Sequence, residues 1–510
     1  MPTLHSNRPY RSIDPDRRTV PRRGDLTNAQ EAGNHMHRKW WALIAVCAAI
    51  FMLLLDITIV NVALPSIQKS LGATFSQLQW IVDAYALTLA SLLLTSGSIS
   101  DIYGRRLVFS AGLILFVLAS AGCALAQDPA QLIGARAVQG VGGAMMFATS
   151  LAILATTFHG RERGVALGAF GATTGLAVAV GPTAGGMLTE WANWQWIFII
   201  NVPIGIAALA LTLTQVQESK SPAGGRIDAI GVVTFSGALF ALVLALIEGD
   251  AWGWDSRRVI GLFVASAVLL GLFVIAELKQ SRPMFDLGLL RNRTFLGAGI
   301  VAFTLSASMF AMFLLFVLYL QYILGYSPVE TGVRFLPLSG VSFIAAAVSG
   351  RLTVVVPRRM LMGIGMLCVT VALCWMSLID ASSTWLDLLG GFILGGIGIG
   401  LVNPALASTA VGVVEPQRSG MASGINSTFR QVGIATGIAV LGVVFSQSVP
   451  NVQATTATLF VEGFVNALHV AIGIAAAGTI CAFTLIRERD MVSQNGGAAA
   501  EPQPSPTPAT

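Results

Sequence analysis

Three ionisable residues lie inside stretches of sequence that are otherwise apolar. Asp56 falls in "FMLLLDITIVNVALP", Asp83 in "QWIVDAYALTLA" and Arg136 in "GARAVQGVGGAMM". A carboxylate removed from water favours its neutral form, and a guanidinium beside it favours the ionised form. Such a set can load and release a proton or a cation. We expect Asp56 to be the leading site, Asp83 to share its proton, and Arg136 to be the partner; structural hydrogen bonds and a helix-packing salt bridge are the alternatives.

The elements that position these residues are those of a membrane protein. The chain has 510 residues, of which 55% are hydrophobic and 11% are charged, whereas an ordinary soluble domain carries about 25% charged residues. Soluble cores are too small to bury so much apolar sequence. A charge at the centre of a membrane helix costs about 2.5–3.5 kcal/mol. Asp56 must therefore face protein or water rather than lipid.

Fourteen segments between residues 40 and 486 are long enough to cross a bilayer, whose apolar core of about 30 Å needs about 20 residues. Most of the 30 Lys and Arg residues lie before residue 40 or in the links after even-numbered segments. Because cytoplasmic links carry the excess of positive charge, both termini are expected in the cytoplasm. The sequence thus predicts an all-α, multi-pass protein of the cell (inner) membrane.

An internal repeat suggests how the spans are grouped. A shift of 256 residues superimposes the glycine-rich stretch from Gly164 on the one from Gly420, and carries the first span near 40 to the ninth near 295. The chain then reads as two parallel six-helix bundles separated by an inserted helix pair, an arrangement typical of transporters that rock two bundles around a central site. The expected parts are a disordered basic tail (1–39), a bundle (40–213), a helix pair (228–276), a second bundle (295–486) and a disordered tail (487–510).

The basic tail resembles a nucleic-acid-binding arm in composition, but it precedes a membrane span and is rich in Pro, Asp and Asn. We therefore interpret it as a topology signal, with no nucleic-acid partner.

The shortest cytoplasmic link reads "GSISDIYGRRLVF" and combines glycines, one acid and two arginines. Asp101 could pair with an arginine or a helix terminus in one conformation and release it in another, as a latch does. A merely solvated hairpin is the alternative. The predicted latch residues are Gly97, Asp101, Gly104, Arg105 and Arg106.

Two further groups of residues could serve transport. "GPTAGG" in the fifth span joins a proline, which removes a backbone hydrogen bond, to glycines that permit close helix approach. It predicts a seam that closes the inner route when the protein faces outward, or else ordinary packing; its residues are Gly181, Pro182, Gly185 and Gly186. Buried polar residues that could line a substrate site are Asn61, Gln139, Asn403, Asn426 and Arg430. For Arg430 a bridge to Asn426 or Gln431 is the simpler interpretation.

These motifs resemble those of the major facilitator superfamily. The latch residues match G-x-x-x-D-x-x-G-R-R, with Ile102 where the family usually has arginine. Four stretches are similar to the fourteen-helix drug:proton antiporter branch, and the likeness runs from residue 40 to 486. They are "LLLDITIVNVALP", "GARAVQGVGGAMM", "GPTAGG" and "NWQWIFIINVPIG", the last with Gln195 where arginine or glycine is usual.

The resemblance implies a proton-coupled secondary transporter that exports small hydrophobic or amphiphilic compounds, including drugs and antibiotics, by alternating access. It implies a coupling role for Arg136, protons and a small molecule as partners, and no cofactor; we expect a monomer in the bilayer. An uptake symporter and an exporter of an endogenous metabolite are the alternatives. An enzyme is disfavoured because the sequence holds no H-E-x-x-H, G-x-S-x-G or P-loop motif, and no metal-ligand pattern.

Overall fold

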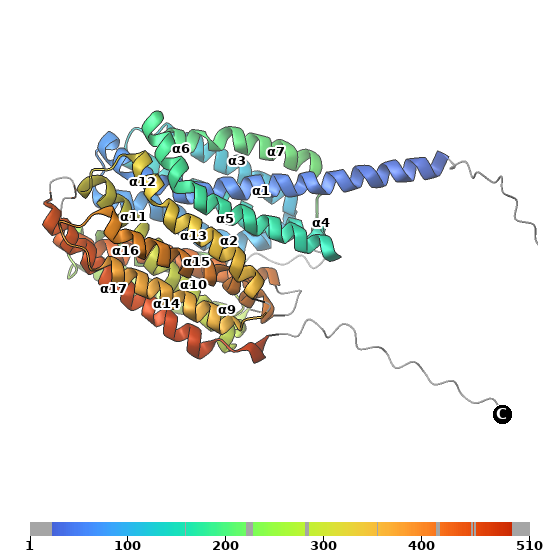
Figure 1. Cartoon of the computed structure of the whole chain (residues 1–510). Helices are drawn as coiled ribbons and strands as arrows, with labels where there is room; N and C mark the ends of the chain where they lie inside the picture. Colours follow the sequence, from blue (N-terminus) through green and yellow to red (C-terminus); the bar gives the residue numbers. More distant parts are fainter. Residues whose placement is uncertain are drawn as a thin grey trace, which may run out of the picture.

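The computed structural model describes residues 23–158, 160–220, 228–280, 285–353, 355–414, 419–449, 452 and 455–491. Throughout these residues the regular structure is helical, and thirteen helices are long and apolar enough to cross a membrane. Helix α5, with 32 residues, takes the place of the fifth predicted span. The prediction of an all-α membrane protein is therefore confirmed (Figure 1).

The first six spans form one bundle, in which α3 packs on α4 and α7, α2 packs on α4, and α1 packs on α5 and α7. The sixth span is broken at Ile200, because Pro203 has no N–H to donate to Ile199. The helices are α1 (Arg23–Leu71), α2 (Phe75–Tyr103), α3 (Arg105–Ala124), α4 (Pro129–Thr157), α5 (Gly160–Trp191), α6 (Trp196–Ile199) and α7 (Asn201–Gln215).

The last six spans repeat this pattern of neighbours. Helix α14 packs on α15 and α17, α13 packs on α15, and α10 packs on α16 and α17. The helices are α10 (Arg293–Leu305), η2 (Ser306–Phe310), α11 (Met312–Leu318), η3 (Tyr319–Ile323), α12 (Pro328–Arg334), α13 (Leu336–Leu352), α14 (Arg358–Met376), α15 (Trp385–Gly412), α16 (Ser419–Ser448), α17 (Ala457–Leu485) and η5 (Glu488–Asp490).

Two of these later spans are irregular. The ninth span continues through two π-helical turns, η2 and η3, and the tenth is broken at Phe335, where Pro337 cannot donate to Val333. The breaks leave both spans able to cross the membrane, so the predicted positions of the spans hold.

The inserted pair consists of α8 (Ala229–Trp252) and α9 (Arg257–Lys279), followed by the short helix η1 (Leu287–Arg291). Helix α8 packs on both α2 and α16 and so covers the line where the two bundles meet. Trp80 and Ser76 of α2 donate hydrogen bonds of 3.0 Å each to Glu248 of α8. The pair is thus fastened to the first bundle and touches the second.

The N-terminal tail begins differently from the prediction. Helix α1 starts at Arg23, so residues 23–39, expected to be disordered, continue the helix of the first span (Figure 1). The physical reason is that an existing helix is extended at little cost by residues such as Ala, Gln and Glu. Residues 1–22 and 492–510 lie outside the described residues.

The start of α1 and the end of α17 lie at one end of the bundle, here called the proximal end, and the opposite end is called distal (Figure 1). The two bundles are joined at the distal end. Gln321 of η3 donates to the Val62 carbonyl of α1 at 2.9 Å, and Gln79 of α2 donates to the Ile438 carbonyl of α16 at 2.9 Å. Among the described residues, α4 and α15 do not pack extensively. The molecule is therefore closed at its distal end.

Candidate functional site

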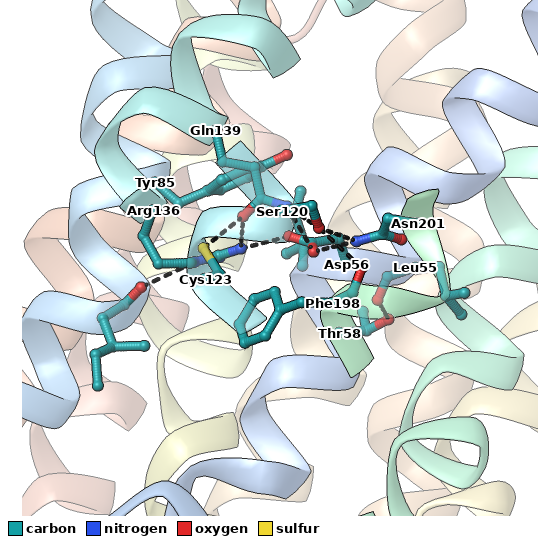
Figure 2. Close-up of polar contacts among 12 residues, drawn as sticks. Leu55, Asp56, Thr58, Tyr85, Ser120, Cys123, Arg136, Gln139, Phe198 and Asn201 are labelled. Carbon is teal, nitrogen blue, oxygen red and sulfur yellow. Dashed lines mark hydrogen bonds and ion pairs between the residues drawn. The ribbon is translucent and has the colours of Figure 1, made fainter. Parts of the chain in front are cut away.

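Asp56 is fully buried inside the first bundle and is bound by three side chains from other helices (Figure 2). Its Oδ2 forms an ion pair with Arg136 Nη1. Its Oδ1 accepts hydrogen bonds of 2.9 Å from Gln139 Nε2 and 2.9 Å from Asn201 Nδ2. Both amides also donate to Ser120 Oγ, at 3.2 and 2.9 Å. The charge of the carboxylate is therefore neutralised and its lone pairs are largely satisfied.

Arg136 is held equally firmly, with 1% of its surface exposed. Its Nε donates to the Ile81 carbonyl at 3.1 Å, and its Nη1 also donates to Gln139 at 2.8 Å. Its guanidinium carbon lies 4.3 Å from the ring centre of Tyr85 and 5.9 Å from that of Phe198. Because the guanidinium is shielded from water, these cation–π contacts further stabilise its position.

Glycines let the helices approach closely enough to build this site. A Cβ on Gly142 of α4 would lie 2.8 Å from the Gly112 carbonyl of α3, and a Cβ on Gly140 would collide with Thr88 and Tyr85 of α2. Because α4 lies so near both neighbours, Arg136 can reach α2 while Gln139, one turn further on, reaches α3.

Asp83 is also fully buried, but neither of its carboxylate oxygens has a hydrogen-bond partner in the described part of the chain. Its direction explains why. Ile81 and Tyr85 of α2 face Arg136, and Asp83 points about 200° away from both at 100° per residue. On that side, neighbours on α2 such as Ala86 and Leu87 pack against α8 and α16. The expected sharing of a proton between Asp56 and Asp83 is therefore wrong, because the two acids face opposite sides of α2.

The predicted latch is assembled as a loop between α2 and α3. Arg105 donates to Asp101 Oδ1 from Nη2 at 2.8 Å and from Nε at 3.2 Å. Gly104 has φ +123°, a value that disfavours any side chain. A Cβ there would also lie 2.6 Å from the carboxylate of Glu218. The loop is thus internally paired, and a second acid lies against it.

Glu218 is a residue that the sequence did not single out. Its carboxylate accepts hydrogen bonds of 3.0 Å each from the backbone N–H groups of Arg106 and Leu107, at the first turn of α3. An acid at a helix N-terminus satisfies free N–H groups and the helix dipole. Gly97 lies one turn before Asp101, where a Cβ would meet open space.

The fifth-span motif makes its contacts at the distal end. Cβ atoms on Gly181 and Gly185 would collide with Thr58 and Ile59 of α1, and a Cβ on Gly186 would collide with Pro328 of α12. The backbones of α5 and α12 meet again where Gly332 lies against the Pro182 carbonyl, and Thr183 Oγ1 donates to the Gly332 carbonyl at 3.2 Å. The glycines of this motif therefore sit in the distal half of α5, where Gly181 and Gly185 pack on α1 and Gly186 joins the two bundles. The expectation that the motif closes the inner route stays a prediction.

The predicted substrate-lining residues do not form one cluster. Gln139 belongs to the Asp56 site, and Asn61 donates to the Ile57 carbonyl of its own helix at 3.0 Å. Arg430 donates to Asn403 Oδ1 at 3.2 Å, joining α16 to α15, whereas Asn426 Oδ1 has no partner within the described residues. The predicted bridge from Arg430 to Asn426 or Gln431 is thus replaced by one to Asn403.

Sequence reasoning missed Asn201 and Ser120, which complete the shell around Asp56. Asn201 lies in "NWQWIFIINVPIG", so its place in a motif was a usable signal, whereas a serine in an apolar span gives none. In the described residues, no group of three or more His, Cys, Asp and Glu side chains is placed to hold a metal ion.

Comparison with known proteins gives the family. A profile described as Major Facilitator Superfamily matches residues 46–438. The chain is 34% identical over 479 residues to the puromycin resistance protein pur8 of Streptomyces alboniger, covering 91% of this chain and 94% of that protein. It is 37% identical over 405 residues to the multidrug resistance protein Stp of Mycobacterium tuberculosis (79% and 75%). It is 36% identical over 420 residues to the tetracenomycin C resistance and export protein of Streptomyces glaucescens (81% and 77%). The chain belongs to the Major Facilitator Superfamily.

Proposed function

We propose that this protein is a proton-coupled exporter of small hydrophobic or amphiphilic compounds, antibiotics and other drugs among them. It works by alternating access as a monomer in the cell membrane, with both termini in the cytoplasm and no cofactor. Relatives named for resistance to puromycin, for multidrug resistance and for export of tetracenomycin C support this class of cargo.

The observation that carries the proposal is the contrast between the two buried acids. Asp56 and Arg136 neutralise each other inside the first bundle, where both are shielded from solvent, so the pair holds the helices in place. Asp83 has no donor and no cation beside it in the described structure, which favours its neutral, proton-bound form. We therefore assign the transported proton to Asp83, and the positioning of α1, α3 and α4 to the Asp56–Arg136 pair.

The position of Asp83 suits coupling because it lies on the face of α2 that packs on α8 and α16. When the bundles rock, α2 and α16 move relative to each other, so water reaches Asp83 in one state and not in the other. With the distal end taken as the outside, the conformation described here is closed to the exterior. A proton bound from outside is then released toward the cytoplasm as cargo leaves.

The test uses the purified full-length protein in liposomes loaded with an uncharged fluorescent amphiphile such as Nile red. An imposed pH difference should drive uphill movement of the dye in the direction opposite to the proton, and the movement should stop when an ionophore removes the difference. Transport that ignores the pH difference would overturn the proposal. Movement of dye and proton in the same direction would instead identify an uptake symporter.

A further inference from the structure

The second bundle contains one charged residue that the coupling scheme does not use. Arg430 lies near the middle of α16, eleven residues from its start, or about 17 Å at 1.5 Å per residue. Its side chain is half-buried, and its hydrogen bond to Asn403 is the one it makes within the described residues. Within the part of the chain that the structure describes, its Nε and Nη1 make no hydrogen bond and are not sealed from solvent. An unpaired cation at this depth marks a functional place in a membrane protein.

The second bundle offers Arg430 no carboxylate. The ion pairs within the described residues involve Arg105, Arg136, Arg358, Arg489 and Lys39, and none involves Arg430. The acids of this bundle that the structure describes fall in links or in the first two turns of a helix; they are Glu330, Asp380, Asp387 and Glu462. Among the described residues, no carboxylate forms an ion pair with Arg430.

The exposed face of α16 shows what Arg430 points toward. Gly433 packs on α10 and Gly437 on η2, and Ala435 and Ala439 lie in a buried cluster with α2 and α8. Half-exposed residues recur at intervals of three or four on the remaining face, at Ser423, Ser427, Arg430 and Ile434. Beyond Ile434 the helix is buried on all sides as far as Ala439. The polar stripe thus runs from Ser423 to Arg430, in the half of α16 that begins at the proximal end.

We propose that Arg430, steadied by Asn403, binds the ionised acid group of the cargo, so that the preferred substrates are amphiphilic organic acids. This inference rests on the proposed function and names the substrate class of that exporter. A guanidinium presents a planar set of donors that matches a carboxylate in two parallel hydrogen bonds. Asn403 Oδ1 accepts from Nη2 of Arg430 alone, so Nε and Nη1 would be the donors to the cargo.

The charges of the other buried groups favour an anion in the same way. The Asp56–Arg136 pair sums to zero, and Asp83 is neutral when it carries its proton, so these three residues of the first bundle add no net charge to that of Arg430. A cationic compound would meet that charge without a counter-ion on the second bundle. An anionic compound would neutralise it, and a membrane potential negative inside would also favour its outward movement.

The experiment compares three probes that share a pyrene ring and a butyl chain. These probes are 4-(pyren-1-yl)butyrate, its uncharged amide, and 4-(pyren-1-yl)butylamine, which is a cation. Binding to the purified full-length protein is followed by energy transfer from tryptophan to pyrene at neutral pH. We expect the carboxylate to bind about tenfold more tightly than the amide, as one charge-assisted hydrogen bond provides, and the ammonium probe to bind most weakly.

Substitution of Arg430 separates recognition from folding. Arg430→Gln should weaken binding of the carboxylate about tenfold, to the level of the amide, while leaving the amide unchanged. Arg430→Lys keeps the charge but loses the planar fork, so it should retain part of the preference. Arg334→Gln is the matched control, because Arg334 lies over the Tyr326 ring at the distal end, 3.4 Å from its centre; it should leave all three affinities unchanged.

Two outcomes would overturn the inference. One is an Arg430→Gln protein that keeps the preference for the carboxylate, and the other is equal weakening of carboxylate and amide, which would indicate a purely structural arginine. Either can occur while an imposed pH difference still drives uphill movement of the amide probe by the wild-type protein in liposomes. Failure of that movement for every probe would instead contradict the proposed function.

Discussion

The first bundle contains two buried acids that lie within 27 residues of each other in sequence but have opposite surroundings. Asp56 has an arginine, two amides and a serine-centred network around it, whereas Asp83 has no partner in the described residues. Both lie on helices of similar composition. The difference teaches that the role of a buried carboxylate depends on the helix face from which it projects and on the neighbours that this face meets. Asp56 links helices inside the first bundle, whereas Asp83 lies where that bundle packs on α8 and α16.

The strongest way to break this comparison is to remove the titratable group of Asp83. Asp83→Asn should abolish uphill export driven by a pH difference while leaving downhill exchange of substrate intact, because an amide cannot carry the proton. The free energy of unfolding should change by less than about 1 kcal/mol, because a neutral group replaces a neutral group. Proton and substrate fluxes in liposomes would check this; retained proton-driven export would contradict the assignment.

Removing the partner of Asp56 should instead destabilise the protein. Arg136→Ala leaves an unpaired buried carboxylate, and the free energy of unfolding should fall by about 3–5 kcal/mol. The double variant Asp56→Asn with Arg136→Gln should recover most of that loss, because it buries no charge. Unfolding by increasing sodium dodecyl sulfate in mixed micelles provides the measurement. A single variant as stable as the wild type would show that the pair is not holding the helices.

A smaller effect is expected from removing the side-chain amide of Asn201 on α7, which donates a hydrogen bond to Asp56. Asn201→Ala removes one hydrogen bond to a charged group and should lower the free energy of unfolding by about 1.5–3 kcal/mol. Asn61→Ala serves as the matched control, since Asn61 donates only to its own helix at 3.0 Å. Equal losses for the two variants would mean that the network around Asp56 contributes nothing special.

Chemical labelling sharpens the comparison without mutation. Dicyclohexylcarbodiimide reacts with neutral carboxyl groups in apolar places, so it should modify Asp83 in preference to Asp56 by about tenfold or more. Mass spectrometry of peptides from α1 and α2 would measure the ratio. Labelling of Asp83 should fall as the pH is raised, and preferential labelling of Asp56 would reverse the assigned roles.

The smallest effect concerns the hydroxyl of Tyr85, which is buried without a hydrogen-bond partner among the described residues. Tyr85→Phe keeps the ring 4.3 Å from the Arg136 guanidinium carbon and removes only the unbonded oxygen. Because a buried hydroxyl without a partner costs stability, the free energy of unfolding should stay the same or rise by up to about 1 kcal/mol. A clear loss of stability or of proton-driven export would show that the hydroxyl acts on the site through water or cargo.

Much of the fold could be predicted because it depends on local sequence. Runs of about 20 apolar residues define membrane spans whatever they pack against, and the spans lie where hydropathy placed them. The pairing of Asp56 with Arg136 was also predictable, since two opposite charges in apolar spans must find each other. These inferences need residue type and spacing but no knowledge of helix rotation.

The other features of the site depend on how each helix is rotated about its axis and on contacts between distant parts of the chain. Neither can be inferred from a single sequence. Asp83 and Tyr85 are two residues apart, yet packing of α4 on one side of α2 and of α8 and α16 on the other sends them in opposite directions. Glu218 reaches the first turn of α3 from 111 residues further along the chain. The distal position of the fifth-span seam likewise follows from the partner of Gly186, Pro328, which the motif itself does not reveal.

The inserted helix pair gives the transporter two unlike flanks. Helix α8 covers the junction of α2 and α16, whereas at the opposite junction, between α5 and α13, the side chains of Leu176, Val180, Phe343, Ile344 and Val348 are exposed in the described structure. The two junctions therefore present unlike surfaces to the bilayer. On one flank lipid meets the inserted helix pair, and on the other it meets the side chains of the bundles themselves.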